Sequence, residues 1–492
     1  MALAEELRTS LQEFLAAGNL EIRESGGRIT PLPPISWEVR GTAEKPLLHL
    51  WAENCNLTRR VVAITDHSAE RMALAVERFG KAQPQRLDLV RLDFQRSEKK
   101  ISREGFCEQL RRILAEQFPD ETVEKLSIAA DLEHSLSRVY ARGVSKKGGT
   151  YCAFLAVPEG ETADAVESSL TYALLWLQRA REGSRRLPIS YLRLILPQGA
   201  VVGLSDRLRS LHPQLAIQVF ELNSLNEEIT RVEPCADGNV NTWLIPRRES
   251  EVLKGRASEA LAPIVAMQPE AISVHAVPPE QEVVLRFRGL TFARWNDGRV
   301  YFGVGTAEEE LTIASENKFK RLVAQLHDFR HPVASDTRHP YYRVQAERWM
   351  QSLVSRDLTR IDIHLDPEHV YEQVFARAGR QHGVLDLLAM RRAKRLAIIE
   401  LKATENPDLP LQAAEYWTRI RRHQLHGDLE RYGFFPGLQL QALPPILYLV
   451  APELRFHPTT STILGYLNPE IEIVRVGLGE NWRRGLRVTR RH

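Results

Sequence analysis

The sequence has few cysteines, no long apolar run and almost no net charge. Its four cysteines (Cys55, Cys107, Cys152 and Cys235) are scattered over 492 residues, without zinc-ligand spacing or a close pair that would suggest a disulfide framework. Such thiols fit a reducing compartment, so we expect a cytoplasmic protein. No stretch of about eighteen apolar residues occurs, which argues against a membrane span. The net charge of +3 excludes a chain that acts as a polycation throughout.

The composition is otherwise ordinary. Apolar residues make up 43% and charged residues 26% of the chain, values typical of a soluble globular protein. The length exceeds what one hydrophobic core accommodates and predicts several domains. The first eight residues predict the start of an amphipathic helix rather than a secretory signal, which would need a longer apolar stretch.

The most informative segment lies between residues 383 and 402. Gly383 is followed three residues later by Asp386, and thirteen residues separate Asp386 from Glu400-Leu401-Lys402. The apolar runs on either side of a basic turn predict a β-hairpin, and strand alternation places Glu400 and Lys402 on one face. Two carboxylates beside an ammonium are costly in an apolar setting unless they are compensated. Paired carboxylate oxygens suit Mg²⁺, and the ammonium suits a phosphate or an activated water.

This pattern resembles the signature of the PD-(D/E)XK nuclease superfamily, an aspartate followed after a spacer by Glu-x-Lys. Two further elements fit the RecB-like branch of that superfamily. Glu347 stands at the start of a helical pattern, and Gln412 and Tyr416 are four residues apart on one helix face. The resemblance covers roughly residues 339–478.

The resemblance implies a role for each matching residue. Asp386 and Glu400 would ligate Mg²⁺ or Mn²⁺, with the Leu401 carbonyl as a further ligand, and Glu347 would bind a second metal or orient water. Lys402 would position the attacking hydroxide and stabilise charge on the phosphate. Gln412 and Tyr416 would contact the substrate or brace the lysine. An iron–sulfur cluster, which some RecB-like nucleases carry, and zinc are not expected, because the cysteines do not provide the ligands.

Each feature also has a simpler interpretation. Asp386 alone could make hydrogen bonds at a turn, Glu400 and Lys402 alone could be a surface ion pair, and Gln412–Tyr416 could belong to a plain amphipathic helix. The joint arrangement favours the catalytic interpretation, because the flanking isoleucines predict a strand buried on both faces. His382 and His423 flank the site, and we assign them no role.

Basic residues cluster toward the end of the chain. Beside a nuclease centre such clusters favour contacts with phosphates, which supply most non-specific affinity for nucleic acid, although they could equally be solvated surface. The candidate nucleic-acid-binding residues are Arg391, Arg392, Arg419, Arg421 and Arg422.

Weak internal similarity suggests that residues 106–222 are a degenerate copy of the same fold. In this alignment Ala156 and Pro158 stand at the positions of Glu400 and Lys402, and nine residues are missing where the strand of Asp386 should lie. The first copy would therefore have no site and would form an internal pseudo-dimer with the second. The matching blocks are 131–142 with 366–377, 153–172 with 397–416, 188–192 with 445–449, and 211–217 with 467–473.

The predicted fold class is α/β: a restriction-endonuclease-like mixed sheet flanked by helices, duplicated, with β-rich accessory regions. In the β-rich regions the sequence predicts strands near 35–39, 47–51, 60–64 and 87–92, a hairpin of 283–287 with 300–303 turned at Asn296–Gly298, and a helix near 248–266. The expected domains are a β-rich domain at 1–98, a degenerate nuclease-like domain at 99–228, a connector with a β-rich domain at 229–338, and a catalytic domain at 339–492.

The expected function is hydrolysis of phosphodiester bonds, most simply of DNA, in repair or defence. One alternative is a nucleic-acid-binding or scaffold protein whose nuclease fold no longer cuts. Another is an effector nuclease gated by a small ligand, although no glycine-rich phosphate loop supports it. The sequence leaves open endonuclease or exonuclease mode, polarity and oligomeric state.

Overall fold

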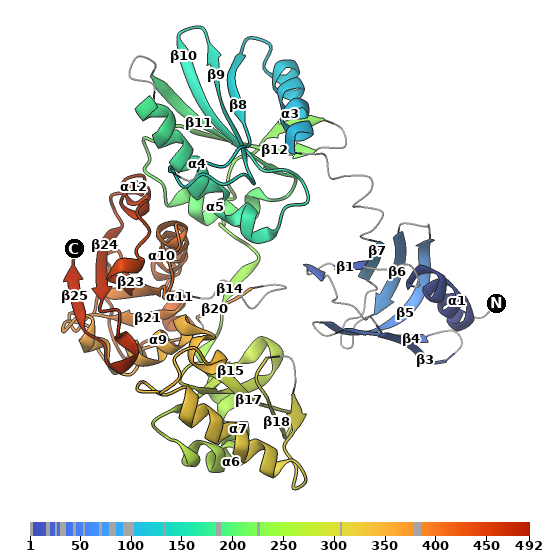
Figure 1. Ribbon diagram of the computed structural model, residues 1–492, viewed down its shortest axis with the longest axis vertical. Coiled ribbons are helices and arrows are strands. Elements are labelled where there is room, and N and C mark those ends of the chain that lie inside the picture. Colours follow the sequence, from blue (N-terminus) through green and yellow to red (C-terminus); the bar gives the residue numbers. More distant parts are fainter. Residues whose placement is uncertain are drawn as a thin grey trace. The chain divides into compact units, whose positions relative to one another are not determined.

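The chain divides into two compact units in the computed structural model (Figure 1). One unit is Met1–Arg103 with Ala378–Gln381, and the other is Glu104–Arg377 with His382–His492. The structure describes residues 3–15, 20–24, 27–29, 36–42, 46–52, 55–67, 71–77, 85–91, 103–131, 133–183, 188–223, 227–305, 308–372, 374–377 and 385–492. Within these ranges no helix is both long and apolar enough to cross a membrane.

The first unit is an antiparallel sheet with a helix on it. The sheet has the order β2-β1-β7-β6-β5-β4-β3. Helix α1 (Leu3–Leu15) buries Leu7, Leu11 and Phe14, spaced as one face of an amphipathic helix, in the same core as the strands. The four strands expected here are present as β3, β4, β5 and β7. The strands are β1 (Leu20–Glu24), β2 (Gly27–Ile29), β3 (Ser36–Gly41), β4 (Pro46–Ala52), β5 (Cys55–His67), β6 (Arg71–Glu77) and β7 (Gln85–Arg91).

A six-stranded mixed sheet opens the second unit. Its order is β13-β12-β11-β10-β9-β8, with β10, β11 and β12 parallel and the remaining pairs antiparallel. Helix α3 packs on one face and α4 on the other, so the central strands are buried on both sides. The elements are α3 (Arg103–Gln117), β8 (Thr122–Ser127), β9 (Ala141–Lys147), β10 (Thr150–Ala156), α4 (Ala163–Gly183), β11 (Ile189–Pro197), α5 (Val201–Arg209), β12 (Ile217–Asn223) and β13 (Glu228–Arg231).

A second mixed sheet, of five strands, closes the chain. Its order is β21-β22-β23-β24-β25, and its pairs run antiparallel, parallel, parallel and antiparallel. Helix α9 shares a core with one face of β22 and α10 with the other. The elements are α9 (Ala346–Val354), β21 (Leu387–Met390), β22 (Leu396–Leu401), α10 (Leu409–Leu425), α11 (Asp428–Arg431), β23 (Ile446–Pro452), α12 (Thr460–Leu464), β24 (Glu472–Leu478) and β25 (Val488–Arg491).

Strand pairing corrects the sequence alignment of these two segments. Ala156 of β10 pairs with Ala141 of β9, so a strand does occupy the place where nine residues were expected to be missing. The extrapolated register of the other hairpin places Asp386 opposite Glu400, which makes Ala141 the counterpart of Asp386. The alignment of the next strand is also displaced. It matched Leu192 to Leu449, but Ile195 is the residue that pairs with Ala156, whereas Leu449 pairs with Glu400. The sequence comparison did not determine either register, since hydrophobic strands align almost equally well in neighbouring registers.

A third sheet lies between these segments in sequence. It has the order β15-β16-β17-β18-β19 and packs against α6 and α7 in a core of its own. The predicted helix and the turn after Asn296 are present, but β17 intervenes, so β16 and β18 are not hairpin partners as expected. The elements are α6 (Arg247–Met267), β15 (Ile272–Val277), β16 (Glu282–Phe287), β17 (Leu290–Asn296), β18 (Arg299–Phe302), β19 (Glu309–Glu310), α7 (Glu316–Phe329) and α8 (Pro340–Arg343).

Short elements complete the second unit. A two-stranded pair joins β14 (Thr242–Leu244) to β20 (Phe375–Arg377), so the segment that follows β13 is tied to the chain before β21. The 3₁₀ helices are η1 (Pro278–Glu280), η2 (Leu358–Arg360), η3 (Glu453–Arg455) and η4 (Trp482–Arg484).

Candidate functional site

The hairpin of β21 and β22 brings Asp386 and Glu400 to one end of the last sheet. Asp386 directly precedes β21, and its Oδ2 accepts a hydrogen bond from the backbone N–H of Leu401 at 2.8 Å. Every residue of β21 and β22 is buried, because both faces of these strands lie in hydrophobic cores. The predicted Gly383 lies outside the described residues.

Helix α9 supplies the third carboxylate. Glu347 stands in its first turn, and its Oε2 lies 3.5 Å from Lys402 Nζ. The same Nζ lies 3.9 Å from Glu400 Oε1. Lys402 directly follows β22, and its backbone N–H donates to the Val450 carbonyl, which fixes the lysine at the strand end. The structure therefore gathers the four predicted acidic and basic side chains around one point.

The charges of this cluster are incompletely compensated. Glu400 is 1% exposed, and its Oε2 has no hydrogen-bond partner among the described residues. Burial, reinforced by Asp386, raises the pKa of Glu400 well above its ordinary value. Burial also raises the pKa of Asp386 to about 6, against the opposing influence of Lys402. Three carboxylates face one ammonium, an excess of negative charge that a divalent cation would offset.

Lys402 is held as a cation. Burial alone would lower its pKa, but the surrounding carboxylates, Glu400 first and then Glu347, outweigh burial and raise it. At neutral pH the side chain therefore presents an ammonium and does not act as a proton acceptor. Such a group can stabilise negative charge on a phosphate.

One buried arginine fixes the start of α9. Arg330 follows α7, and its guanidinium lies 4.8 Å from the ring centre of Trp349. It ties the turn between β16 and β17 to the segment that enters α9, and so determines where Glu347 stands. The carbonyls that accept its hydrogen bonds are those of Phe287, Arg288, Tyr341, Val344 and Gln345.

Gln412 and Tyr416 lie on α10 as expected, but Tyr416 is only 1% exposed. It stacks on Phe375, and the pKa of its hydroxyl is raised well above the ordinary value by burial and by nearby Glu400. Gln412 hydrogen-bonds to it. Burial of Tyr416 argues against its contact with substrate, and the alternative, that it braces Lys402, stays a prediction.

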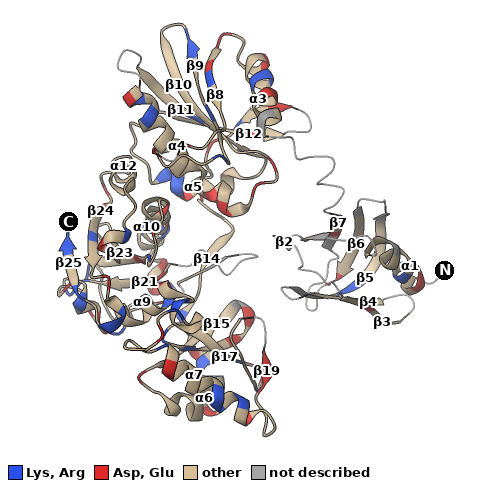
Figure 2. Cartoon of the chain, in the orientation of Figure 1, with Lys and Arg blue, Asp and Glu red and all other residues tan. Residues whose placement is uncertain are grey.

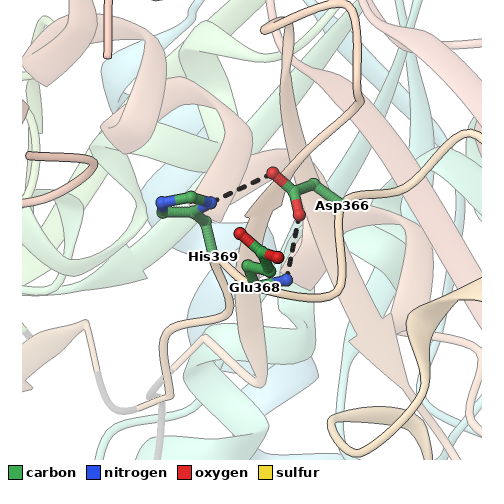
Figure 3. Close-up of side chains that lie close together, drawn as sticks. All are labelled: Asp366, Glu368 and His369. Carbon is green, nitrogen blue, oxygen red and sulfur yellow. Dashed lines mark hydrogen bonds and ion pairs between the residues drawn. The ribbon is translucent and has the colours of Figure 1, made fainter. Parts of the chain in front are cut away.

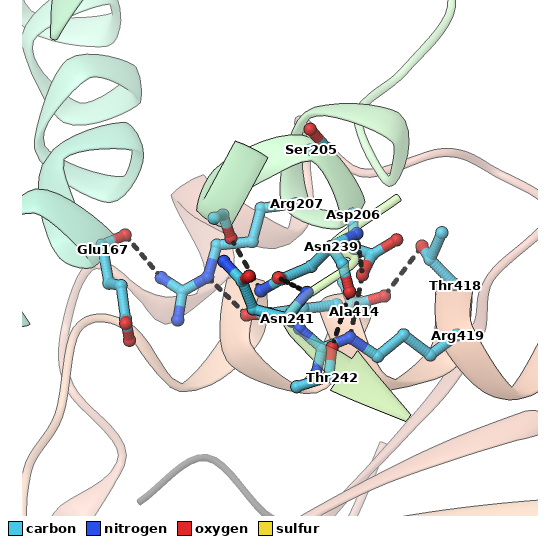
Figure 4. Close-up of polar contacts among 12 residues, drawn as sticks. Glu167, Ser205, Asp206, Arg207, Asn239, Asn241, Thr242, Ala414, Thr418 and Arg419 are labelled. Atoms are coloured by element: carbon cyan, nitrogen blue, oxygen red, sulfur yellow. Dashed lines mark hydrogen bonds and ion pairs between the residues drawn. The ribbon is translucent and has the colours of Figure 1, made fainter. Parts of the chain in front are cut away.

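The candidate arginines do not form one surface. Arg419 was expected to contact phosphate, and this is wrong, because it is 2% exposed and ion-paired with Asp206 (Figure 4) and with Glu415. Arg422 also pairs with Asp206, at 3.0 Å, and stays partly accessible.

Arg421 is partly buried as well and bonds to the Ala442 carbonyl. Arg391 pairs with Asp362 at 3.2 Å, whereas Arg392 is exposed at the hairpin turn. Arg490 and Arg491 add positive charge on β25 (Figure 2).

A second acidic group gathers Asp366, Glu368 and His369 (Figure 3). Asp366 Oδ2 lies 3.0 Å from His369 Nδ1, and its Oδ1 accepts the Glu368 N–H. The aligned pair Asp131 and His134 makes the same contact at 2.9 Å. Local hydrogen bonds of this kind, present in two separate loops, fit a loop-stabilising role, so we do not assign this group to the site.

The sequence did not point to Gln351. It stands one turn after Glu347 on α9, is buried, and donates through Nε2 to the Asp386 carbonyl at 3.0 Å. The four-residue spacing from Glu347 was the available signal.

Comparison of the sequence with models of known protein families and with curated proteins finds no match. The function is therefore inferred from geometry and the motif alone.

The raised pKa of Asp386 predicts a pH-dependent cost to stability in metal-free protein. A carboxyl with an ordinary pKa of 3.8 when unfolded and about 6 when folded favours folding only while it is protonated. The unfolding free energy of D386N minus that of the parent should therefore increase as pH rises from about 4 to 6 and then level off, by at most about 3 kcal/mol. Urea unfolding in chelator at several pH values measures this, and a constant difference would contradict the electrostatic argument.

Proposed function

We propose that this protein is a metal-dependent nuclease that hydrolyses phosphodiester bonds, most simply those of DNA. The observation that carries the proposal is the buried Glu400 carboxylate, whose Oε2 has no partner among the described residues although Asp386, Glu347 and Lys402 surround it. Burying a carboxylate in this way costs free energy unless a bound cation compensates its charge. Asp386, Glu400, the Leu401 carbonyl and Glu347 form an oxygen-only donor set, as Mg²⁺ prefers.

Each residue then has a defined task. Bound Mg²⁺ would act as a Lewis acid and lower the pKa of water near the phosphate. Asp386 is oriented by the Leu401 N–H and Glu400 by strand β22, so the backbone of the hairpin holds both carboxylates at its end. Glu347, with a side chain 40% exposed, would orient water from the solvent side. Lys402 would stabilise negative charge that develops on the phosphate.

We further propose that the two mixed sheets are copies of one restriction-endonuclease-like fold. Both place a hairpin, two parallel crossovers and a final antiparallel strand in the same order, with a long helix after the second hairpin strand. Their mutual contacts are reciprocal: α5 packs on α10, and α12 packs on α4. Leu211 and Leu467, which correspond in sequence, form an antiparallel bridge with each other. A pseudo-twofold axis produces contacts of this kind.

Only one copy carries the acidic cluster. Ala141, Ala156 and Pro158 stand at the positions of Asp386, Glu400 and Lys402, and both alanines are fully buried. One live centre would cut one strand in each encounter, which favours nicking or processing of single strands. The inert copy would then contribute to substrate holding.

Cleavage of labelled DNA is the direct test. We expect purified protein to cut single- or double-stranded DNA with Mg²⁺ or Mn²⁺ and to be inactive with chelator. Labelled RNA of the same sequence decides substrate class. Binding of DNA without cleavage under any metal condition would instead favour the alternative, a nucleic-acid-binding protein with an inactive nuclease fold.

A further inference from the structure

A cavity of about 70 Å³ lies where sheet β15–β19 meets helix α9. One water needs roughly 10–15 Å³ of such volume, so the cavity can hold a small polyatomic ligand. Arg356 on its wall is exposed, which places its mouth at the surface. The walls carry three arginines and three serines: Arg286, Arg348, Arg356, Ser273, Ser352 and Ser355.

The cavity carries excess positive charge. Arg286 is 4% exposed and lies 3.7 Å from Glu372, the one carboxylate among the described residues that line the cavity. Burial, with repulsion from Arg348, lowers the pKa of Arg286 to about 9, which still leaves it charged at neutral pH. Burial also lowers the pKa of His275, so the imidazole is neutral there. Three guanidinium groups on the walls therefore face one carboxylate.

The walls are held rigidly. Gly289, at φ +81°, lies so close to α9 that an added Cβ would stand 2.2 Å from the Arg348 carbonyl oxygen. Glu372 accepts from His275 Nδ1 at 3.0 Å, and His275 Nε2 lies 2.7 Å from Ser273 Oγ. Arg348 on α9 thus keeps a fixed distance from Arg286 on the sheet, and a preorganised pocket loses little entropy on binding.

We propose that this cavity binds a phosphate group. Guanidinium groups form directed, paired hydrogen bonds with phosphate oxygens. The net positive charge and the small volume select a compact anion over a neutral or bulky ligand. The phosphate can belong to a free phosphate compound or to the end of a nucleic-acid strand, and the chemistry of recognition is the same.

The chain Ser273–His275–Glu372 has the connectivity of a serine hydrolase triad, but its surroundings argue against that use. The three arginines favour an anion over a neutral ester. Glu372 is also shared with Arg286, so it neutralises part of the arginine charge in addition to orienting His275. The chain is better explained as the support of the anion pocket.

The cavity borders the acidic cluster without being part of it. Gln351 lines the cavity and donates to the Asp386 carbonyl, and Arg348 follows Glu347 on α9. A bound phosphate would therefore lie beside the elements that position two of the candidate metal ligands. Phosphate binding at this cavity does not require that the protein cuts DNA.

Calorimetric titration with inorganic phosphate, in chelator and at constant ionic strength, tests the cavity. We expect the parent protein to bind phosphate and the variant R348Q/R356Q to bind at least about ten-fold more weakly, since each lost arginine removes a charge-assisted hydrogen bond. Arg286 is left unchanged because its substitution would leave buried Glu372 with less compensation and so disturb folding. R321Q, which removes an exposed arginine on α7, is the matched control and should bind like the parent.

Absence of phosphate binding by the parent, or equal binding by R348Q/R356Q and R321Q with unchanged thermal unfolding, would overturn the proposal. Pairs of oligonucleotides with and without a terminal phosphate then identify the source. Tighter binding of the phosphorylated member, lost in R348Q/R356Q, supports a strand end as the ligand. Equal binding of both members, with phosphate still bound by the parent, supports a free phosphate compound. Because these measurements exclude metal, their outcome is independent of the cleavage test.

Discussion

D386N and E400Q are each expected to lower DNA cleavage by at least about 100-fold while the protein stays folded and binds DNA. Each change removes one negative charge from the acidic cluster at nearly constant volume, and electrostatic groups of this kind contribute about that much or more. Asp386 and Glu400 occupy the end of a hairpin whose two strands are buried throughout, and in D386N the Leu401 N–H can still donate to the amide oxygen that replaces the carboxylate. Cleavage rates and calorimetric Mg²⁺ titration measure the effect.

E405Q is the matched control, because Glu405 is an exposed carboxylate three residues after Lys402. It should cleave like the parent. If D386N or E400Q cleaves DNA at close to the parental rate, the assignment of these residues to the catalytic site is wrong. If cleavage is lost but the affinity for Mg²⁺ is unchanged, the residues belong to the site but do not bind the metal.

Two substitutions of Lys402 distinguish the need for its positive charge from the need for its compact shape. K402A should slow cleavage strongly, and K402R should restore little, since a wide guanidinium does not replace a compact ammonium beside Glu347 and Glu400. Because Lys402 balances part of the carboxylate charge, both variants are assayed over a range of Mg²⁺ concentrations. A rate for K402R near that of the parent would show that any cation suffices there.

R207A is expected to lower the free energy of unfolding by about 3–5 kcal/mol. Arg207 on α5 is buried and pairs with Asp408 at 2.8 Å and with Glu415 at 2.7 Å. It also donates to the Glu167 carbonyl (Figure 4). Removing it leaves buried Asp408 without its cation and leaves Glu415 with Arg419 alone, and this loss, rather than the net value of the ion pairs, sets the magnitude. Urea unfolding at neutral pH measures the change.

R209A provides the comparison on the same helix, since Arg209 is exposed near its end. It should change stability by no more than about 0.5 kcal/mol. A cost below about 1 kcal/mol for R207A would mean that the two mixed sheets are not held together by this network. The sheets would then be joined mainly by their shared apolar core.

The sequence predicted the elements of the candidate site because local patterns encode them. Apolar runs around a basic turn are enough to predict the β21–β22 hairpin, and alternation is enough to place Glu400 and Lys402 on one side. Helical spacing likewise predicts that Gln412 and Tyr416 share a face of α10. The encounter of Glu347 with Lys402 could be expected only through the family resemblance, because no local rule joins residues 55 positions apart.

Burial of charged residues was not predictable in the same way. Arg419 and Arg392 look alike in sequence, yet one is enclosed by Asp206 and Glu415 and the other is exposed at a turn. Local spacing gives the face of a helix but not the neighbour that covers it. The partners of Arg419 include a residue on α5, more than two hundred positions away.

By itself the sequence determined the mixed α/β character of the chain and the identity of the acidic cluster, because strand and helix periodicity and the motif spacing are local. The tertiary structure alone decided which carboxylates lose solvent, which arginines are neutralised, and that three arginines and one glutamate line the same cavity. These properties depend on desolvation and on distances between segments far apart in the chain. Local periodicity carries no information about either quantity.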